Sequence, residues 1–382
     1  MDPGRALSLG GLLCYATEVV EPSAARVKAF DWLRGLAVLV MIECHAMVLL
    51  RQELLGTHAA AVMNWLNGLV APSFIFAAGF SLALVQVRTV RAGGARGSRL
   101  LRTLRRIGEV FAVGTLINWV WFPISVEPAW LLRVDILQCI GVSLLFALPL
   151  FAGLAATPRR LLLASLAVAT ALFFAAPFAD GYRGVLQDWV NKDGPHHSVF
   201  PLLPWAGWVF LGGAVGAVAG SADLRRVRNL LVAIGVVGGG VWLLQPLWLS
   251  LYPPHAFWVT DPANSAQRCV VVMVLLLGLS VVEARASTPF RASAPVRFLE
   301  IFGTSSLAAY FFHEMLLYYQ VRGVSLAGIA GGKCGWLGYA LLTAAVIGTT
   351  AVLAALTDRV YRWVDGSRRT VSRPGPRVAP VA

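Results

Sequence analysis

Long apolar runs, separated by short polar connections, follow one another along most of the chain. Each run holds about 20 residues, which is the length that an α-helix needs to cross the hydrocarbon core of a bilayer. The pattern predicts about ten membrane-spanning helices. Their expected bounds are 32–50, 60–87, 107–122, 134–155, 161–179, 202–219, 230–250, 266–282, 298–319 and 336–356.

These runs indicate an all-α integral membrane protein, a polytopic bundle. Backbone N–H and C=O groups in lipid must find partners within their own segment, as they do in a helix. The strands of a membrane barrel would alternate polar and apolar residues, and these runs do not. We expect a cytoplasmic N-terminal segment at 1–30, a transmembrane domain at 31–357 and a basic, disordered cytoplasmic tail at 358–382.

Composition excludes a soluble domain. Hydrophobic residues make up 58% of the chain and charged residues 13%, whereas charged residues are about 25% of an ordinary soluble domain. The five cysteines are scattered without a CxxC pair, so they predict no disulfide framework. His196, His197 and His255 match no ligand spacing of a metal site. We therefore expect no metal and no tightly bound cofactor.

Basic residues gather in alternate connections, which fixes an expected orientation. By the positive-inside rule, the richer connections and both termini face the cytoplasm of a plasma or bacterial inner membrane. This arrangement accounts for the net charge of +13 without a nucleic-acid partner. The basic residues of the richer connections include Arg88, Arg91, Arg102, Arg105, Arg106, Arg159, Arg160, Arg225, Arg226, Arg228, Arg285, Arg291 and Arg297, and those of the poorer ones are Arg51, Arg133, Arg183, Lys192, Arg322 and Lys333.

Few polar residues fall inside the first apolar run, and each needs a reason, because a charge at mid-bilayer costs about 3 kcal/mol. Asp31 and Arg34 are three residues apart, so they share a helix face and can pair. His45 follows Arg34 by eleven residues, and eleven steps of about 100° return to the same face. That face presents a cation near the cytoplasm and an imidazole toward the outer leaflet. An ion pair that orients the helix and a simple interhelical hydrogen bond are the structural alternatives.

Polar residues of other runs are expected at the outer level of His45. They are Asp135 and Gln138 in the fourth run and His313 and Glu314 in the ninth, and His58 lies in the connection before the second. Neighbouring residues on a helix point about 100° apart. We therefore expect at most one of His313 and Glu314 to enter a shared cavity.

Several motifs resemble one family in order along the chain. The stretch 26–39, with Asp31, Arg34 and Gly35, resembles the opening helix of the heparan-alpha-glucosaminide N-acetyltransferase catalytic-domain family. The spacing of Arg34 and His45 is similar to the Arg/His pair of the wider acyltransferase-3 superfamily. The stretches 135–143, 201–213 and 303–314 resemble the family's fourth-helix, Pro-Trp and Tyr-x-x-His-Glu motifs.

The resemblance implies transfer of an acetyl group from cytoplasmic acetyl-CoA to a glycan or amino sugar on the far side of the membrane. The spacing of His58 and Pro72 reproduces that of the catalytic histidine and proline in the lysosomal member. Gly68 stands where that member has an aspartate, and the aromatic and Asn positions after the histidine are missing. The lysosomal type lacks a histidine at position 45, whereas acyltransferase-3 members have one. His45 and His58 both remain candidates.

The residues permit a mechanism of acyl transfer. Arg34, supported by Asp31, would bind the phosphates of CoA together with Arg102, Arg105 and Arg106. His45 or His58 would be the general base or be acylated transiently. Gln138 would donate to the thioester oxygen, and Asp135 and Glu314 would orient an imidazole or bind sugar hydroxyls. A transporter or channel for a small polar solute and an inactive family member with a binding role are the alternatives, and a homo-oligomer is left open.

Overall fold

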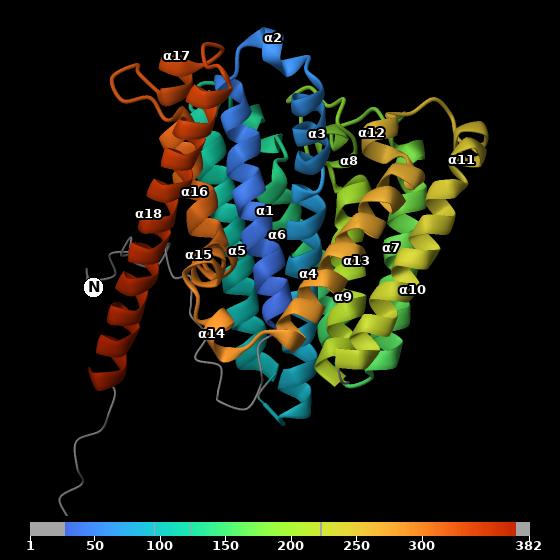
Figure 1. Ribbon diagram of the computed structural model, residues 1–382. Helices are drawn as coiled ribbons and strands as arrows, with labels where there is room; N and C mark the ends of the chain where they lie inside the picture. Colours follow the sequence, from blue (N-terminus) through green and yellow to red (C-terminus); the bar gives the residue numbers. More distant parts are fainter. Residues whose placement is uncertain (1–26, 95, 123, 222–223, 372–382) are drawn as a thin grey trace, which may run out of the picture.

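A computed structural model describes residues 27–371 except 95, 123 and 222–223, and for residues 96, 98 and 364–371 it describes the backbone alone. In this part of the chain every long element is a helix, and the long helices stand side by side (Figure 1). This confirms the all-α bundle. Residues 1–26 and 372–382 lie outside the described residues, as does most of the expected N-terminal segment.

Eight candidate spans in the described residues are long and apolar enough to cross a membrane. They correspond to eight of the expected apolar runs. They are α1 (Lys28–Ala46) with η2 (Met47–Leu49), α3 (His58–Asn67) with α4 (Val70–Arg91), α6 (Ile136–Leu154), α7 (Pro158–Ala179), α9 (Leu202–Ser221), α10 (Leu224–Leu243), α13 (Pro262–Arg285) and α18 (Trp336–Val371).

The other two expected spans form helices that differ from the eight. α5 (Arg96–Trp121) is long, but its first turns are rich in arginine. The run expected at 298–319 is divided at Ser305 into α15 (Ala294–Thr304) and α16 (Ser306–Tyr318), each too short to span alone. Gly303 lies against α1, where a Cβ would come within 2.1 Å of the Asp31 carbonyl oxygen. α15 and α16 therefore approach α1 as two separate segments.

Short helices cap the two ends of the bundle (Figure 1). The α2 end carries α2 (Gln52–Leu55), α8 (Gln187–Val190), α11 (Gln245–Leu251), α12 (Phe257–Thr260) and α17 (Leu326–Ala330), with η3 (Pro128–Leu132) nearby. The α14 end carries α14 (Thr288–Arg291) and the arginine-rich start of α5. α18 continues to Val371, so the first part of the segment expected to be a disordered tail is helical.

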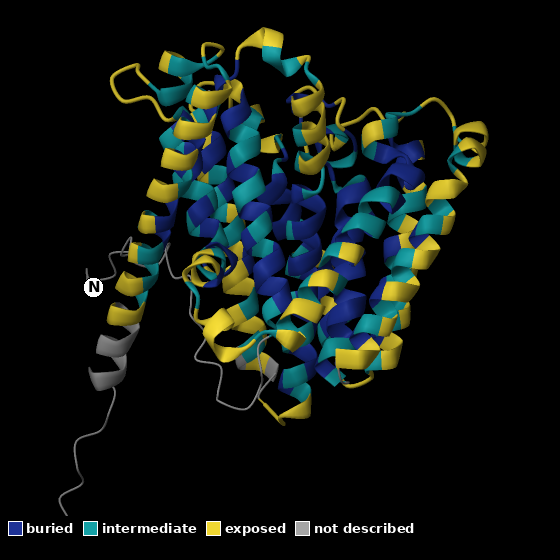
Figure 2. Cartoon of the chain, in the orientation of Figure 1, coloured by how far each residue is buried: buried dark blue, intermediate teal, exposed yellow. Residues whose placement is uncertain are grey.

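The centre of the bundle is the contact of α4 with α9. A Cβ at Gly79 would come within 1.9 Å of the Val209 carbonyl oxygen, and one at Gly212 within 2.0 Å of the Phe76 carbonyl oxygen. Small residues at these positions let the two backbones approach, as is common between membrane helices. Exposed residues lie on the outward faces of peripheral helices such as α10 and α18 (Figure 2), and they include Val236, Leu243, Leu337 and Leu341. An apolar outer face of this kind suits lipid.

Candidate active site

Two helices bring three ionisable side chains together at the α2 end of the bundle. His45 lies in the last turn of α1, and His313 and Glu314 lie in α16. His45 Nδ1 is 2.7 Å from Glu314 Oε1 and 2.8 Å from His313 Nε2. The side chain of His313 is fully buried and that of Glu314 is 9% exposed, while that of His45 is 31% exposed. His45 is therefore the accessible member of the cluster.

We expected at most one of His313 and Glu314 to enter a shared cavity, and the structure joins both of them to His45 in one cluster. Their side chains leave α16 in different directions, but His45 reaches from α1 into the space between them. Its Nδ1 atom contacts both, and His313 Nε2 is 3.5 Å from Glu314 Oε1. A side chain from a second helix can thus contact two adjacent residues that point in different directions. An argument from α16 alone does not include this possibility.

Hydrogen bonds assign the protons of the two imidazoles. His313 Nδ1 is 2.9 Å from the Ala309 carbonyl oxygen, which only accepts, so Nδ1 carries the hydrogen and Nε2 of the neutral ring accepts. His45 Nδ1 must then be the donor toward His313 and Glu314. In neutral His45 the lone pair is left on Nε2, and no described residue forms a hydrogen bond with that atom. Nε2 is thus the basic atom of the cluster.

The same three side chains form a donor set that a divalent cation could use. One ligand atom from each lies within 4.8 Å of the others, and two imidazoles with a carboxylate are common ligands of transition metals. In this geometry the ligand atoms are hydrogen-bonded to one another. An ion would have to replace those hydrogen bonds.

Asp135 belongs to the electrostatic surroundings of the cluster. It precedes α6 at the α2 end and pairs with Arg133, whose Nε is 3.0 Å from Asp135 Oδ2. Burial raises the pKa of Asp135, and Arg133 lowers it. The charge of Glu314 raises the pKa of Asp135 further and that of His45 lowers it. Both residues therefore act electrostatically on the Asp135 carboxylate. Arg133 also donates to the carbonyl oxygens of His196 and His197, which attaches the loop around α8 to this region.

A cavity of about 150 Å³ lies between α1, α4, α5, α6 and α16. Its lining extends from Arg34 to Ile136, the first residue of α6, and includes Tyr310. The Tyr310 ring lies 5.5 Å from the ring of His313. Arg34 is paired with Asp31, as expected from their spacing, and its Nε atom is buried without a hydrogen-bond partner. Tyr310 therefore lies between this cavity and His313, while His45, His313 and Glu314 do not line the cavity.

The structure places the other expected binding residues outside this cavity. Arg102, Arg105 and Arg106 are exposed on α5, and Arg105 pairs with Glu109 at 3.0 Å. Val110 of the same helix lines the cavity, so these arginines lie one to two turns beyond it toward the α14 end. They do not line the cavity.

Two expected catalytic residues lie apart from the cluster. His58 is exposed at the start of α3, and no contact recorded for the described residues links it to His45. Gln138 is buried, and its side-chain oxygen has no hydrogen-bond partner. Its amide packs against Gly114 on α5, 3.1 Å from where a Cβ would be, and Gln138 does not line the cavity.

Sequence reasoning missed the tyrosines beside the site, Tyr318 and Tyr339, whereas it did expect Glu43 to form a separate structural contact. The Tyr318 hydroxyl donates to the His45 carbonyl oxygen at 2.8 Å. Tyr318 follows Glu314 by four residues, and this spacing could have predicted that both lie on the same face of the helix. Glu43 accepts from the Tyr339 hydroxyl and, with the Asn67 amide nitrogen turned toward it, from Asn67 at 2.8 Å. Glu43 thus forms a separate polar contact beside His45.

Comparison with known proteins identifies a family for the chain. No protein of curated function matches the chain. Residues 26–240 match the family described as "Heparan-alpha-glucosaminide N-acetyltransferase, catalytic". The matched part contains Arg34, His45 and Asp135, and α16 with His313 and Glu314 lies beyond it. The family implies a membrane acetyltransferase. Because the match covers more than half of the sequence, the chain belongs to the heparan-alpha-glucosaminide N-acetyltransferase catalytic-domain family.

Proposed function

We propose that this protein transfers an acetyl group from acetyl-CoA, bound at the α14 end, to a sugar amine or hydroxyl at the α2 end. The observation that carries the proposal is the accessible His45 imidazole held by Glu314, next to a cavity that begins at Arg34. Together they supply a base at one end of a path and a cation on that path. The family supports acetyl transfer as the chemistry.

The orientation follows from the distribution of arginine. α5 and the α15–α16 pair would complete ten crossings, with both termini in the cytoplasm. Arginines at the ends of helices lie mainly at the α14 end, among them Arg91, Arg159, Arg225 and Arg285. By the positive-inside rule, the α14 end would face the cytoplasmic side of the cell membrane. Acetyl-CoA would be available on that side.

The donor would enter from the arginine-rich end. Arg102, Arg105 and Arg106 are exposed there, and guanidinium groups suit phosphate oxygens. Arg34, oriented by Asp31, is the cation farther along the path. The cavity walls beyond it are mostly apolar, so they fit the thin pantetheine arm better than a second charged group.

The chemical step uses His45 Nε2 as the general base. Nε2 takes a proton from the acceptor amine or hydroxyl as the acceptor attacks the thioester carbonyl carbon. A C–N or C–O bond forms and the C–S bond breaks. The proton passes from the imidazolium to the leaving CoA thiolate. The Glu314 carboxylate, 2.7 Å from Nδ1, stabilises the imidazolium and fixes the ring, as a carboxylate does in a Ser-His-Asp triad. Gln138 would have to turn toward the cavity to assist.

The test is acetyl transfer by the purified full-length protein in lipid nanodiscs, with labelled acetyl-CoA and glucosamine. We expect His45→Ala to lower kcat about 100-fold or more, since general-base catalysis contributes about 10²–10⁴-fold. His58→Ala is the matched control and should stay within about twofold. Equal loss in both variants would assign the base role to neither histidine. Solute flux into vesicles without use of the donor would favour a transporter instead.

A further inference from the structure

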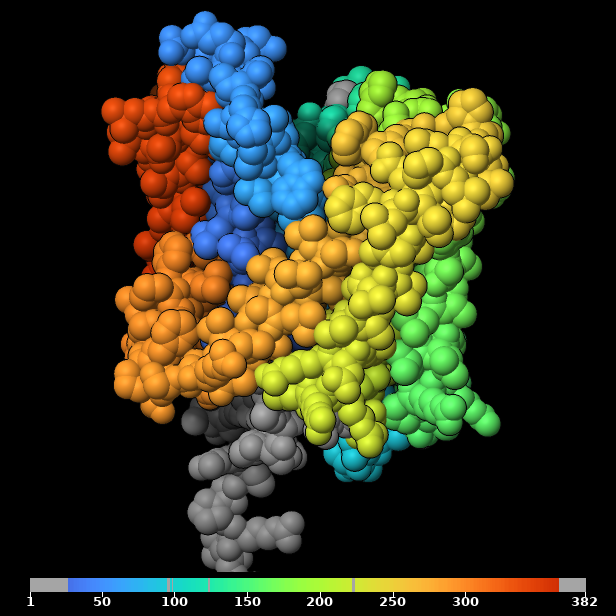
Figure 3. All heavy atoms as spheres, turned by 45° about the vertical axis from the view of Figure 1, so that its right-hand side comes forward, coloured from blue at the N-terminus to red at the C-terminus, as the bar shows by residue number. Residues whose placement is uncertain are grey.

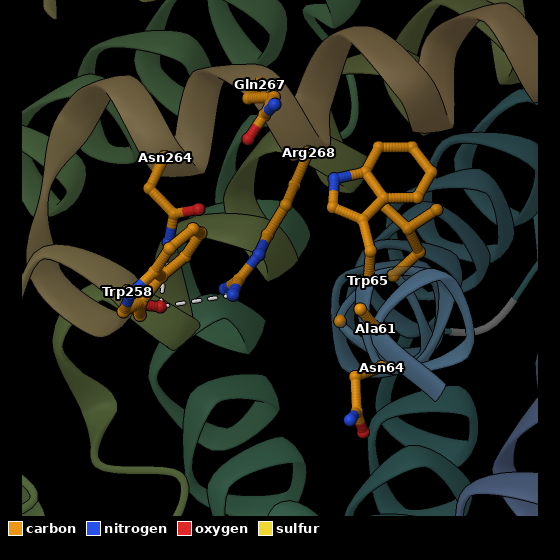
Figure 4. A pocket seen from close by; sticks show the side chains of 9 residues that line it. Ala61, Asn64, Trp65, Trp258, Asn264, Gln267 and Arg268 are labelled. Atoms are coloured by element: carbon orange, nitrogen blue, oxygen red, sulfur yellow. Dashed lines mark hydrogen bonds between the residues drawn. The ribbon is translucent and has the colours of Figure 1, made fainter. Parts of the chain in front are cut away.

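A second and larger cavity, of about 440 Å³, opens at the α2 end between α3 and the α12–α13 corner. The surface is hollowed between these segments, and α13 continues from the hollow toward the α14 end (Figure 3). The polar and aromatic lining consists of the side chains of Asn64, Trp65, Trp258, Asn264, Gln267 and Arg268 (Figure 4). This cavity is separate from the one at Arg34, because the two share no lining residue.

Arg268 is the charged residue of the lining, and it lies within a helix that is long and apolar enough to cross a membrane. Its Cα is about 9 Å beyond Pro262, where α13 begins. The guanidinium reaches back toward that end, because Nη2 donates to the Trp258 carbonyl oxygen at 3.1 Å. An arginine inside a span extends in this way to bring its charge from the apolar core to the level of the lipid headgroups.

The charge of Arg268 is only partly compensated within the protein. Its guanidinium lies 5.7 Å from the centre of the Trp205 ring, but among the described residues no carboxylate forms an ion pair with it. A half-buried cation is costly unless an anion pairs with it, so an anionic ligand would gain a charge-assisted hydrogen bond here. The lining contains no carboxylate, so an ammonium group on the same ligand would find no partner of opposite charge.

The surface beside the cavity suits acyl chains. Trp65 and Trp258 are exposed, and indole side chains are typical of the boundary between headgroups and hydrocarbon. On α13, Gln267 lines the cavity, and Val274 and Val281 follow it at intervals of seven residues, so the three lie on one face of the helix. Val274 is 63% exposed and Val281 is 37% exposed. An exposed apolar strip therefore extends from the cavity along α13, in the direction of the acyl chains of a bound lipid.

We propose that this cavity binds an anionic phospholipid with a hydroxylated headgroup, of the phosphatidylglycerol type. Arg268 binds the phosphodiester, the amides of Asn64 and Gln267 bind the headgroup hydroxyls, and the acyl chains lie along Val274 and Val281. A soluble phosphate ester has the same anion, but it makes no use of the apolar strip. The inference goes beyond the proposed acyl transfer and does not rest on it.

Gly68 provides a way to neutralise Arg268 without removing it. A Cβ at this position would lie 3.8 Å from both Nε and Nη2 of Arg268, so an aspartate there would bring a carboxylate within reach of the guanidinium. Gly68→Asp should therefore pair with Arg268 from within the protein and exclude a phosphate. Gly68→Asn has the same size and meets the same Trp65 carbonyl oxygen at 3.2 Å, but it supplies no charge.

The experiment titrates the full chain in detergent with phosphatidylglycerol, phosphatidylcholine and glycerol 3-phosphate, and native mass spectrometry measures the affinity of the first molecule bound. Phosphatidylglycerol should bind about 10-fold more tightly than either of the others, as one charge-assisted hydrogen bond allows. Arg268→Gln and Gly68→Asp should remove its preference over phosphatidylcholine, while Gly68→Asn should keep it. Arg285→Gln, an exposed arginine at the other end of α13, is the control for net charge and should also keep it.

Three outcomes would overturn the inference: equal affinity for the two lipids, a preference that survives in Arg268→Gln, or equal loss in the Asp and Asn variants. Glycerol 3-phosphate that binds as tightly as phosphatidylglycerol would also contradict it, because the cavity would then take a soluble anion. Melting temperatures of all variants identify any that fail to fold, and Arg268→Gln decides the question if the Gly68 variants do. Lipid binding is measured without acetyl transfer, so this inference and the proposed function fail separately.

Discussion

Two regions lie at the α2 end of the bundle, on the two sides of α3. One is the His45 cluster, formed by His45, His313 and Glu314, and the other is the Arg268 cavity, a cavity of about 440 Å³ that Arg268 lines. Their polar groups differ in whether they have partners within the protein. In the cluster, the polar side-chain atoms of His45, His313 and Glu314 are partners of one another, at distances of 2.7–3.5 Å. In the cavity, the Arg268 cation has no recorded carboxylate partner among the described residues. A satisfied polar network keeps its geometry, whereas a half-buried cation without a carboxylate partner retains part of its desolvation cost.

Replacement of the carboxylate in the cluster should have the largest effect. Glu314→Gln removes the charge that stabilises the His45 imidazolium and can offer an N–H to Nδ1, which would favour the wrong tautomer. We expect kcat to fall about 100-fold or more, with little change in KM for acetyl-CoA. Steady-state kinetics of acetyl transfer in nanodiscs measure both values.

Glu43→Gln is the matched control for this prediction. Glu43 is a carboxylate two residues before His45 in α1, but it bonds to Tyr339. Its replacement should leave kcat within about threefold of wild type, because it does not contact the His45 ring in the recorded contacts. A similar loss in both variants would show that a general disturbance of α1, and not the His45–Glu314 pair, lowers the rate.

Replacement of either Arg34 or Arg268 by glutamine should have a smaller and more specific effect. Arg34→Gln removes the cation of the inner cavity and should raise KM for acetyl-CoA about 10-fold, since a charge-assisted hydrogen bond contributes about that much. Arg268→Gln should leave this KM unchanged, because Arg268 lines a different cavity. Arg159→Gln, exposed at the α14 end, controls for loss of surface charge. Raised KM in both Arg34→Gln and Arg159→Gln would mean that overall charge attracts the donor.

The sequence was a sufficient guide to the helices that are uniformly apolar, because length and hydropathy alone determine whether a segment can span. It was a poorer guide to α5 and to the α15–α16 pair, where arginine and the break at Ser305 interrupt the pattern. The Asp31–Arg34 pair followed from helical spacing. The contact of His45 with both His313 and Glu314 did not, because it depends on how α1 packs against α16.

The Arg268 cavity is a second feature that the sequence pattern could not predict. Arg268 and Gly68 are far apart in the sequence, and only the packing of the end of α3 beside α13 brings a Cβ built on Gly68 within 4 Å of the Arg268 guanidinium. The exposed Trp258 comes from α12, a helix of four residues that no apolar run indicated. Local pattern thus identified the helices, while both candidate sites arise from contacts between helices that are distant in the sequence.

Removal of divalent metal ions should have the smallest effect, and it tests whether the cluster is complete in itself. The three ligand atoms lie close enough to hold an ion, but hydrogen bonds already join them. If those bonds are the working state, dialysis against EDTA should leave kcat within about twofold, because hydrogen bonds within a satisfied network need no further ligand. Added Zn²⁺ should inhibit, since it would displace the proton from Nδ1 and bind the Glu314 carboxylate that orients His45. Activity that disappears with EDTA and returns with one particular metal would instead make the cluster a metal centre, and His45 would then be a ligand and not the base.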